Sequence, residues 1–153
     1  MLTPISQILP RLLRQNPGLE QLIDSLQPSA LTDINQQLPM PRNLDIEVLN
    51  SHVKLHIPTS QFEQAKPHLQ SIFQPLRGFN IYPSLGGWLD DEDQWVIEDI
   101  QLVTAFAPWQ VIRKSFLDIL QGSYDLGKAI QQSAIALEVN IPAGNWMLII
   151  PTK

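Results

Sequence analysis

The sequence of 153 residues contains no cysteine. This absence excludes disulfide bonds, thiol catalysis, and zinc or iron–sulfur sites with cysteine ligands. A chain without cysteine suits a reducing compartment, and the N-terminal region has no apolar run of the length that a signal peptide needs. We therefore expect a cytoplasmic protein.

Long apolar runs and basic clusters are missing as well. No apolar run approaches the roughly 20 residues that a membrane-spanning helix requires. Charged residues make up only 16 % of the chain, and the net charge is −5 with a pI near 5.0. A negative chain without a Lys/Arg cluster is not expected to bind nucleic acid or an anionic membrane.

Residues 1–43 combine prolines with short leucine-rich pieces. Asn16 and Pro17 are suited to start a helix, and leucine and isoleucine follow at helical spacing. A second short helix is expected over residues 29–38. These features predict a helical N-terminal arm over residues 1–43.

From residue 44 onwards the hydrophobic pattern alternates between the periods of strands and helices. The predicted strands and helices, in chain order, are a strand at 52–57, a helix at 60–76, strands at 79–85 and 95–106, a helix at 108–131 and a hairpin at 134–150. This order is typical of an α+β domain with a ferredoxin-like split βαβ sandwich, spanning residues 44–153. We expect an antiparallel sheet with two helices on one face, an extra C-terminal strand, and the strands at 52–57 and 95–106 in its centre.

The stretch 86–100 carries six carboxylates and two tryptophans. Four of the acids lie in a row where a hairpin must turn, and we expect them in solvent: Asp90, Asp91, Glu92 and Asp93. The alternative is a site for a divalent cation. Neighbouring side chains on an extended chain point to opposite sides, and the spacing differs from that of a calcium-binding loop, so no metal site is predicted.

Glu98 and Asp99 differ from the tip because they lie within a predicted central strand. If Ile100, Leu102, Thr104 and Phe106 face the core, Glu98 points inward and Asp99 outward; a bulge would turn both outward. A buried glutamate without a partner has a raised pKa and is a candidate acid or base. No second catalytic group is evident, so no catalytic residue is assigned.

Two surfaces are candidates for partner binding. Trp88 and Trp95 flank the acidic tip, where they form either a cross-strand pair or an exposed patch. The N-terminal arm has an apolar stripe that either packs on its own domain or docks into a partner; the stripe includes Leu9, Leu12 and Leu13.

The open face of the predicted sheet is expected to be polar, without stacking aromatic side chains. His52 and His56 are four strand positions apart, roughly 13 Å, which is too far to chelate one ion together. We expect both histidines in solvent. Ala134 and Ala136 are small and would let a partner approach closely.

The sequence therefore favours a non-enzymatic interaction or assembly module without a cofactor, which binds a protein partner or itself. The candidate partner-binding residues are Trp88, Asp90, Asp91, Glu92, Asp93 and Trp95 of the hairpin, and Leu9, Leu12 and Leu13 of the arm. One alternative is a regulatory domain that senses a small molecule at a subunit interface. The other is a metal-dependent enzyme that uses the carboxylates.

Overall fold

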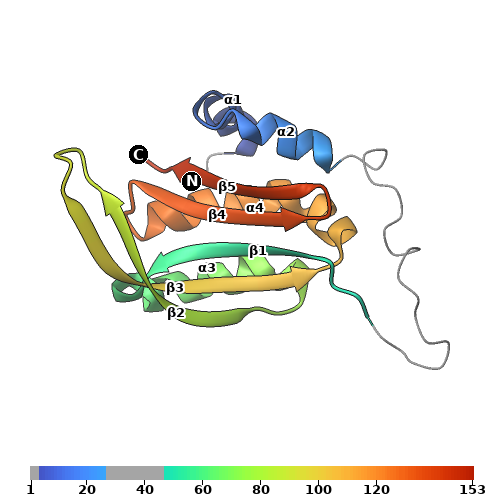
Figure 1. The fold of residues 1–153 in the computed structure, drawn as a ribbon. Coiled ribbons are helices and arrows are strands. Elements are labelled where there is room, and N and C mark those ends of the chain that lie inside the picture. The colour runs from blue at the N-terminus through green and yellow to red at the C-terminus, as the bar shows by residue number, and fades with distance from the viewer. Residues whose placement is uncertain (1–3, 27–46) are drawn as a thin grey trace.

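The computed structural model describes residues 4–26 and 47–153, which form one five-stranded antiparallel sheet with helices packed against it (Figure 1). The helices are α1 (Ile5–Gln15), α2 (Gly18–Ser25), α3 (Phe62–Phe73) and α4 (Trp109–Ala129), with short 3-10 turns η3 (Thr59–Gln61) and η4 (Gln74–Leu76). The strands are β1 (Ser51–Pro58), β2 (Asn80–Leu89), β3 (Trp95–Ala107), β4 (Ala134–Ile141) and β5 (Gly144–Pro151). The helix predicted for residues 29–38 lies outside the described residues.

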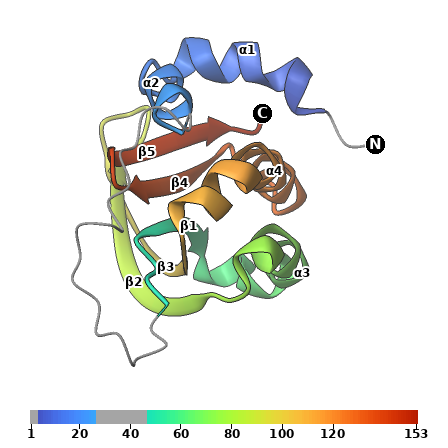
Figure 2. The same ribbon diagram turned by 90° about the vertical axis from the view of Figure 1, so that its right-hand side faces the viewer.

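The strand order is β2-β3-β1-β4-β5, and every neighbouring pair is antiparallel. Helices α3 and α4 cover one face of the sheet, as the turned view shows (Figure 2). This arrangement confirms the predicted α+β class, the ferredoxin-like sandwich and the extra C-terminal strand. β1 and β3 lie in the interior of the sheet, as expected.

The alternation of β1 divides the two faces of the sheet. Val53, Leu55 and Ile57 are fully buried beneath the helices, whereas His52, Lys54 and His56 point to the opposite side and are partly accessible. We call that opposite side the open face. It faces the viewer in Figure 1, with α3 and α4 behind the strands.

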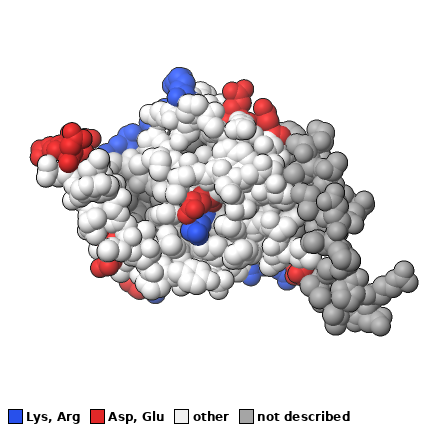
Figure 3. All heavy atoms as spheres, in the orientation of Figure 1, with Lys and Arg blue, Asp and Glu red and all other residues white. Residues whose placement is uncertain are grey.

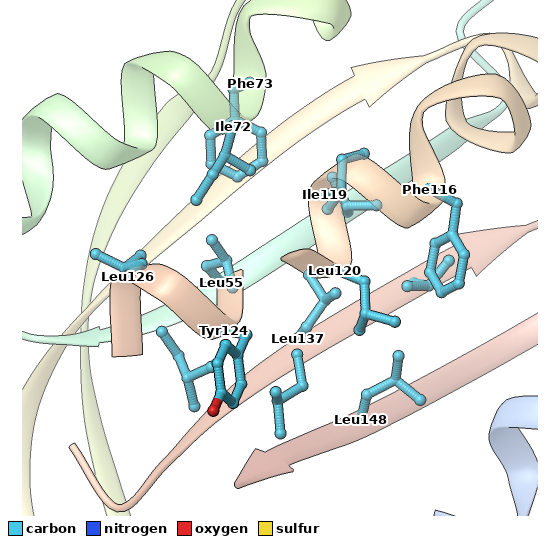
Figure 4. Packing of buried hydrophobic residues seen from close by; sticks show 14 of the residues in the cluster. Leu55, Ile72, Phe73, Phe116, Ile119, Leu120, Tyr124, Leu126, Leu137 and Leu148 are labelled. Carbon is cyan, nitrogen blue, oxygen red and sulfur yellow. The ribbon is translucent and has the colours of Figure 1, made fainter. Parts of the chain in front are cut away.

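The core lies between the sheet and the pair α3 and α4 (Figure 4). Its largest fully buried side chains from this region are Leu55, Ile57, Leu69, Phe73, Ile112, Ile119, Leu120, Leu126 and Ile130. Helix α4 continues past Gly122, as predicted. A glycine fits here because α3 and α4 approach closely. A Cβ added at Gly122 would lie 2.6 Å from Cγ1 of Ile72 on α3.

The N-terminal helices α1 and α2 lie along the edge strand β5 (Figure 2). Arg11 Nη2 donates a hydrogen bond to the carbonyl of Pro151 at 2.9 Å, and the amide of Ile149 donates one to Asn16 Oδ1 at 3.3 Å. Leu12 and Leu22 are fully buried in the same core as the sheet. The helices therefore satisfy polar groups of an edge strand that would otherwise face water.

Every helix among the described residues is too short or too polar to span a lipid bilayer.

Candidate functional site

The register of β3 against β1 decides which of its side chains face the core. Leu55 pairs with Val103, and Val53 pairs with Ala105. Directly paired residues share a face of the sheet, so Val103 and Ala105 lie beneath the helices, and both are fully buried. The opposite set, which includes Glu98, therefore lies on the open face.

This arrangement corrects the expected orientation of β3. The orientation considered from the sequence places Ile100, Leu102, Thr104 and Phe106 in the core, with Glu98 inward and Asp99 outward. The pairing with β1 gives the opposite orientation, because neighbouring residues of a strand point to opposite faces. Val103, Ala105 and Ala107 lie on the buried side of β3. Ile100, Leu102 and Phe106 lie on the open face.

The open face is also less polar than expected. Phe106 lies beside His52, with ring centroids 5.0 Å apart. Tyr82 pairs with Leu102 and Trp88 pairs with Val96, so both aromatic side chains belong to this face as well. Charged side chains are few here, and the acids gather at the hairpin tip (Figure 3).

A groove crosses the open face between the β2–β3 hairpin and strand β4. Its volume is about 460 Å³. Its lining is His56, Pro58, Gly86, Gly87, Trp88, Glu98, Ile100, Gln132, Ser133, Ala134, Ile135, Ala136 and Ile149. Gly86, Ala134 and Ala136 are the residues of this lining with the smallest side chains or none, together with Gly87 and Ser133.

Glu98 is the carboxylate of this groove. It pairs with Gly86, so no side chain stands opposite it on β2. Burial raises the pKa of the Glu98 carboxyl above its ordinary value, because the lining removes water that would stabilise the charge. A carboxyl group with a raised pKa inside a groove is a candidate ligand-binding group.

A second polar group lies at the β4 side of the groove. His56 Nε2 is 2.6 Å from Glu138 Oε2, and Lys54 Nζ is 3.7 Å from the same oxygen. His52 lies further along β1; burial first and the charge of Lys54 second lower its pKa, while Glu138 acts in the opposite direction. His56 lines the groove and His52 does not.

The acidic tip of the hairpin is a turn held by hydrogen bonds of the Asp90 side chain and of the backbone. Asp90 Oδ1 accepts hydrogen bonds from the amides of Glu92 and Gln94, each at 2.9 Å. Asp91, Glu92 and Asp93 are exposed. Within residues 4–26 and 47–153, no three side chains of His, Asp or Glu gather closely enough to hold a metal ion.

The two tryptophans do not form a cross-strand pair. Trp88 is opposite Val96 and Trp95 is opposite Leu89, so their side chains point to opposite sides of the hairpin. Trp88 lines the groove, whereas Trp95 is 70 % exposed on the other side.

The apolar stripe of the N-terminal arm packs on its own domain. Leu12 is fully buried, and Leu9 and Leu13 contact the core. The structure therefore does not bring the leucines of the arm together with the residues of the hairpin.

A larger hollow, of about 940 Å³, lies at the other end of the sheet, near η4 and the start of α4. Glu47 forms part of its wall and directly follows residues 27–46, which the structure does not describe. Its outline is therefore incomplete within the described residues. The groove with Glu98 is the stronger candidate, because a carboxylate and an aromatic ring line it together.

The fold is similar to that of solved structures of an enzyme. A phage SAM lyase in complex with S-methyl-5'-thioadenosine matches with a TM-score of 0.52 and 10 % identity, over 71 % of this chain and 96 % of that chain. The same kind of protein in its apo state matches with a TM-score of 0.49 and 11 % identity, over 68 % and 94 %. No protein-family model and no curated protein sequence matches this chain.

These similarities correct the functional hypothesis drawn from the sequence. A non-enzymatic interaction or assembly module was favoured, but the solved structure with the TM-score of 0.52 is that of an enzyme with a small molecule bound. At this level of identity the likeness shows the fold alone. The residues of a binding site are therefore assigned from the structure of this chain alone.

Sequence reasoning identified Glu98 and Trp88 separately but not the groove that contains both. It placed His56 in solvent, although this residue lines the groove. The available signals were the two glycines opposite the acidic half of β3 and the two alanines of β4. They became informative only when the strand order placed β3, β1 and β4 side by side.

Proposed function

We propose that this protein binds S-adenosylmethionine and related adenosine thioethers in the groove of the open face. The observation that carries the proposal is that Trp88 and Glu98 line one groove, in which Gly86 stands opposite Glu98. A binding site for a small molecule is typically concave and mostly apolar, with a few polar groups that orient the ligand. The volume of the groove lies within the range of ~300–1,000 Å³ that such sites have.

The residues of the hairpin suit a nucleoside. An aromatic ring such as that of Trp88 provides a flat apolar surface on which a purine base stacks. A carboxylate accepts two hydrogen bonds at once and suits the neighbouring hydroxyls of a ribose, so Glu98 is assigned to the sugar. Trp88 lies opposite Val96, two residues from Glu98 on the same face of the hairpin. A base on Trp88 would therefore place the attached ribose near Glu98.

The similar fold of the lyase supports this choice among nucleosides. That structure is of a SAM lyase, an enzyme named for its action on S-adenosylmethionine, and contains S-methyl-5'-thioadenosine. A cytoplasmic location, expected from the missing cysteine, is part of the proposal. Self-association also remains a prediction, supported by the exposed apolar side chains of Leu85, Trp95 and Ile97 on the hairpin.

The test is isothermal titration of the full chain with S-adenosylmethionine, S-adenosylhomocysteine, S-methyl-5'-thioadenosine and ATP, combined with thermal unfolding. At 100 times its dissociation constant, a ligand adds about 2.7 kcal/mol to the stability of the folded state. Chromatography of the mixture with S-adenosylmethionine measures whether S-methyl-5'-thioadenosine is released. We expect saturable binding of the three sulfur compounds and weaker binding of ATP.

Two variants have matched controls in the same hairpin. Glu98→Gln and Trp88→Ala should each weaken binding of all three sulfur compounds. Glu92→Gln and Trp95→Ala remove the same groups from outside the groove and should leave binding unchanged. Binding that is absent in the wild type, or lost equally in the controls, contradicts the proposal.

A further inference from the structure

We propose that His56, oriented by Glu138, determines specificity by accepting a hydrogen bond from the α-ammonium group of S-adenosylmethionine. This inference rests on the proposed function and deepens it. It concerns the end of the groove remote from Trp88, for which the nucleoside supplies no contact.

The first step is the orientation of the imidazole ring. Nε2 of His56 is 2.6 Å from Glu138 Oε2. An ionised carboxylate only accepts hydrogen bonds, so Nε2 carries the hydrogen of this bond. In the neutral ring Nδ1 is then an acceptor, and no proton of the ring is available there.

The second step is the way the neighbours hold this pair. Lys54 lies directly opposite Glu138 in the pairing of β1 and β4, and its ammonium group is 3.7 Å from the oxygen that His56 contacts. His56 lies opposite Ala136, whose methyl group leaves the space beside the imidazole ring open. Both His56 and Ala136 line the groove.

The third step is the separation of the two polar ends. His56 pairs with Leu102, and Leu102 is four residues from Glu98 on the same face of β3. Four strand positions correspond to roughly 13 Å. A compact ligand cannot contact both groups, whereas an elongated ligand with a nucleoside at one end and a charged group at the other can.

The lining between the two ends is apolar. Pro58, Ile100 and Ala134 occupy the intervening part of the groove. The methylene groups that connect the sulfur of S-adenosylmethionine to its α-carbon suit such a surface. The ammonium group beyond them then reaches the imidazole ring, where a charge-assisted hydrogen bond is stronger than a neutral one.

S-methyl-5'-thioadenosine lacks the amino-acid group of S-adenosylmethionine. Comparing the two ligands therefore measures the contribution of the His56 end of the groove apart from that of the Trp88 end. Titration calorimetry of the full chain should show that His56→Ala weakens binding of S-adenosylmethionine roughly ten- to a hundredfold. Binding of S-methyl-5'-thioadenosine should stay within about twofold, because no hydrogen bond to a charged group is lost. His52→Ala is the matched control on the same strand and face, outside the groove, and should change neither affinity.

A pair of amide variants tests the assigned nitrogen atom. His56→Asn keeps an acceptor near the position of Nδ1 and should retain part of the affinity for S-adenosylmethionine. His56→Gln places its amide near the position of Nε2 and should lose the affinity as His56→Ala does. Thermal unfolding of each variant verifies that the chain is folded.

The outcomes distinguish this inference from the proposed function. If S-methyl-5'-thioadenosine binds through Glu98 and Trp88 while His56→Ala leaves S-adenosylmethionine unaffected, only the role of His56 is overturned. Equal losses for both ligands in His56→Ala also overturn it. If the wild type binds none of the sulfur compounds, both proposals are wrong.

Discussion

Gly86 lies directly opposite Glu98 in the antiparallel pairing of β2 and β3. Glu98 therefore has no side chain opposite it on β2; a Cβ at Gly86 would lie 3.3 Å from Cδ1 of Ile100, which lines the same groove. Partial burial in this groove raises the pKa of the Glu98 carboxyl and so makes its ionised form less favourable.

This cost should appear in the pH dependence of stability. The pKa of Glu98 is higher in the folded chain than in the unfolded chain, so the folded state binds more protons between the two values. Stability contributed by this group is present at low pH and is lost as the pH rises from about 4.3, the ordinary glutamate value, through the raised pKa. Glu98→Gln should therefore be more stable than the wild type at neutral pH.

Thermal unfolding between pH 4 and pH 8 measures this difference. It should increase across the window of titration and then remain constant. Glu92→Gln, at the exposed hairpin tip, is the control and should show no such increase. A difference for Glu98→Gln that does not vary with pH would contradict the buried position of the carboxyl group.

Gly122 should be intolerant of side chains because of the contact between α3 and α4. A Cβ at this position would lie 2.6 Å from Cγ1 of Ile72, which is not a flexible chain end. Gly122→Leu should therefore lower the free energy of unfolding by about 1–3 kcal/mol, the usual cost of overpacking. Urea denaturation measures the change, and Gln110→Leu on the exposed side of α4 should have little effect.

Leu12 should contribute to the stability of the whole domain. Its side chain is fully buried between α1 and the rest of the core. Leu12→Ala should cost about 2–5 kcal/mol, the range for removal of a buried leucine side chain. Leu117→Ala on α4 is the control, because that leucine is 46 % exposed. Equal effects of the two variants in urea denaturation would show that α1 does not pack as described.

Asp90 should stabilise the hairpin turn without any metal ion. Its Oδ1 atom accepts two backbone hydrogen bonds, and each is worth about 0.5–1.5 kcal/mol. Asp90→Ala should accelerate hydrogen exchange of the Glu92 and Gln94 amides, whereas Asp91→Ala should not. Protection of these amides that increases with Mg²⁺ or Ca²⁺ would indicate a cation site instead.

The order of the elements in residues 44–153 was predictable because it depends on local periods. Apolar residues alternate along β1 and recur at helical spacing along α4. Both patterns can be read from neighbouring residues, and each is typical of one type of element. Five strands and two helices in this order leave few topologies, and the ferredoxin-like prediction was confirmed. The turn at Asp90 was expected for the same reason, since it is held by contacts over two to four residues.

The orientation of β3 was not predictable, because both of its faces carry apolar side chains. Val103 and Ala105 on one side and Ile100 and Leu102 on the other give the alternation no preferred direction. The pairing with β1 decides it, and this pairing joins residues about 50 positions apart in the chain.

What the sequence by itself determined is the set of local elements and the acidic turn, because neighbouring residues suffice to specify them. Only the tertiary structure decided that Glu98, Trp88 and His56 share a groove. These residues lie on three different strands, β1, β2 and β3, and no local sequence pattern connects them. They meet because strand pairing, driven by burial of the opposite face beneath α3 and α4, aligns β2, β3, β1 and β4 in one sheet.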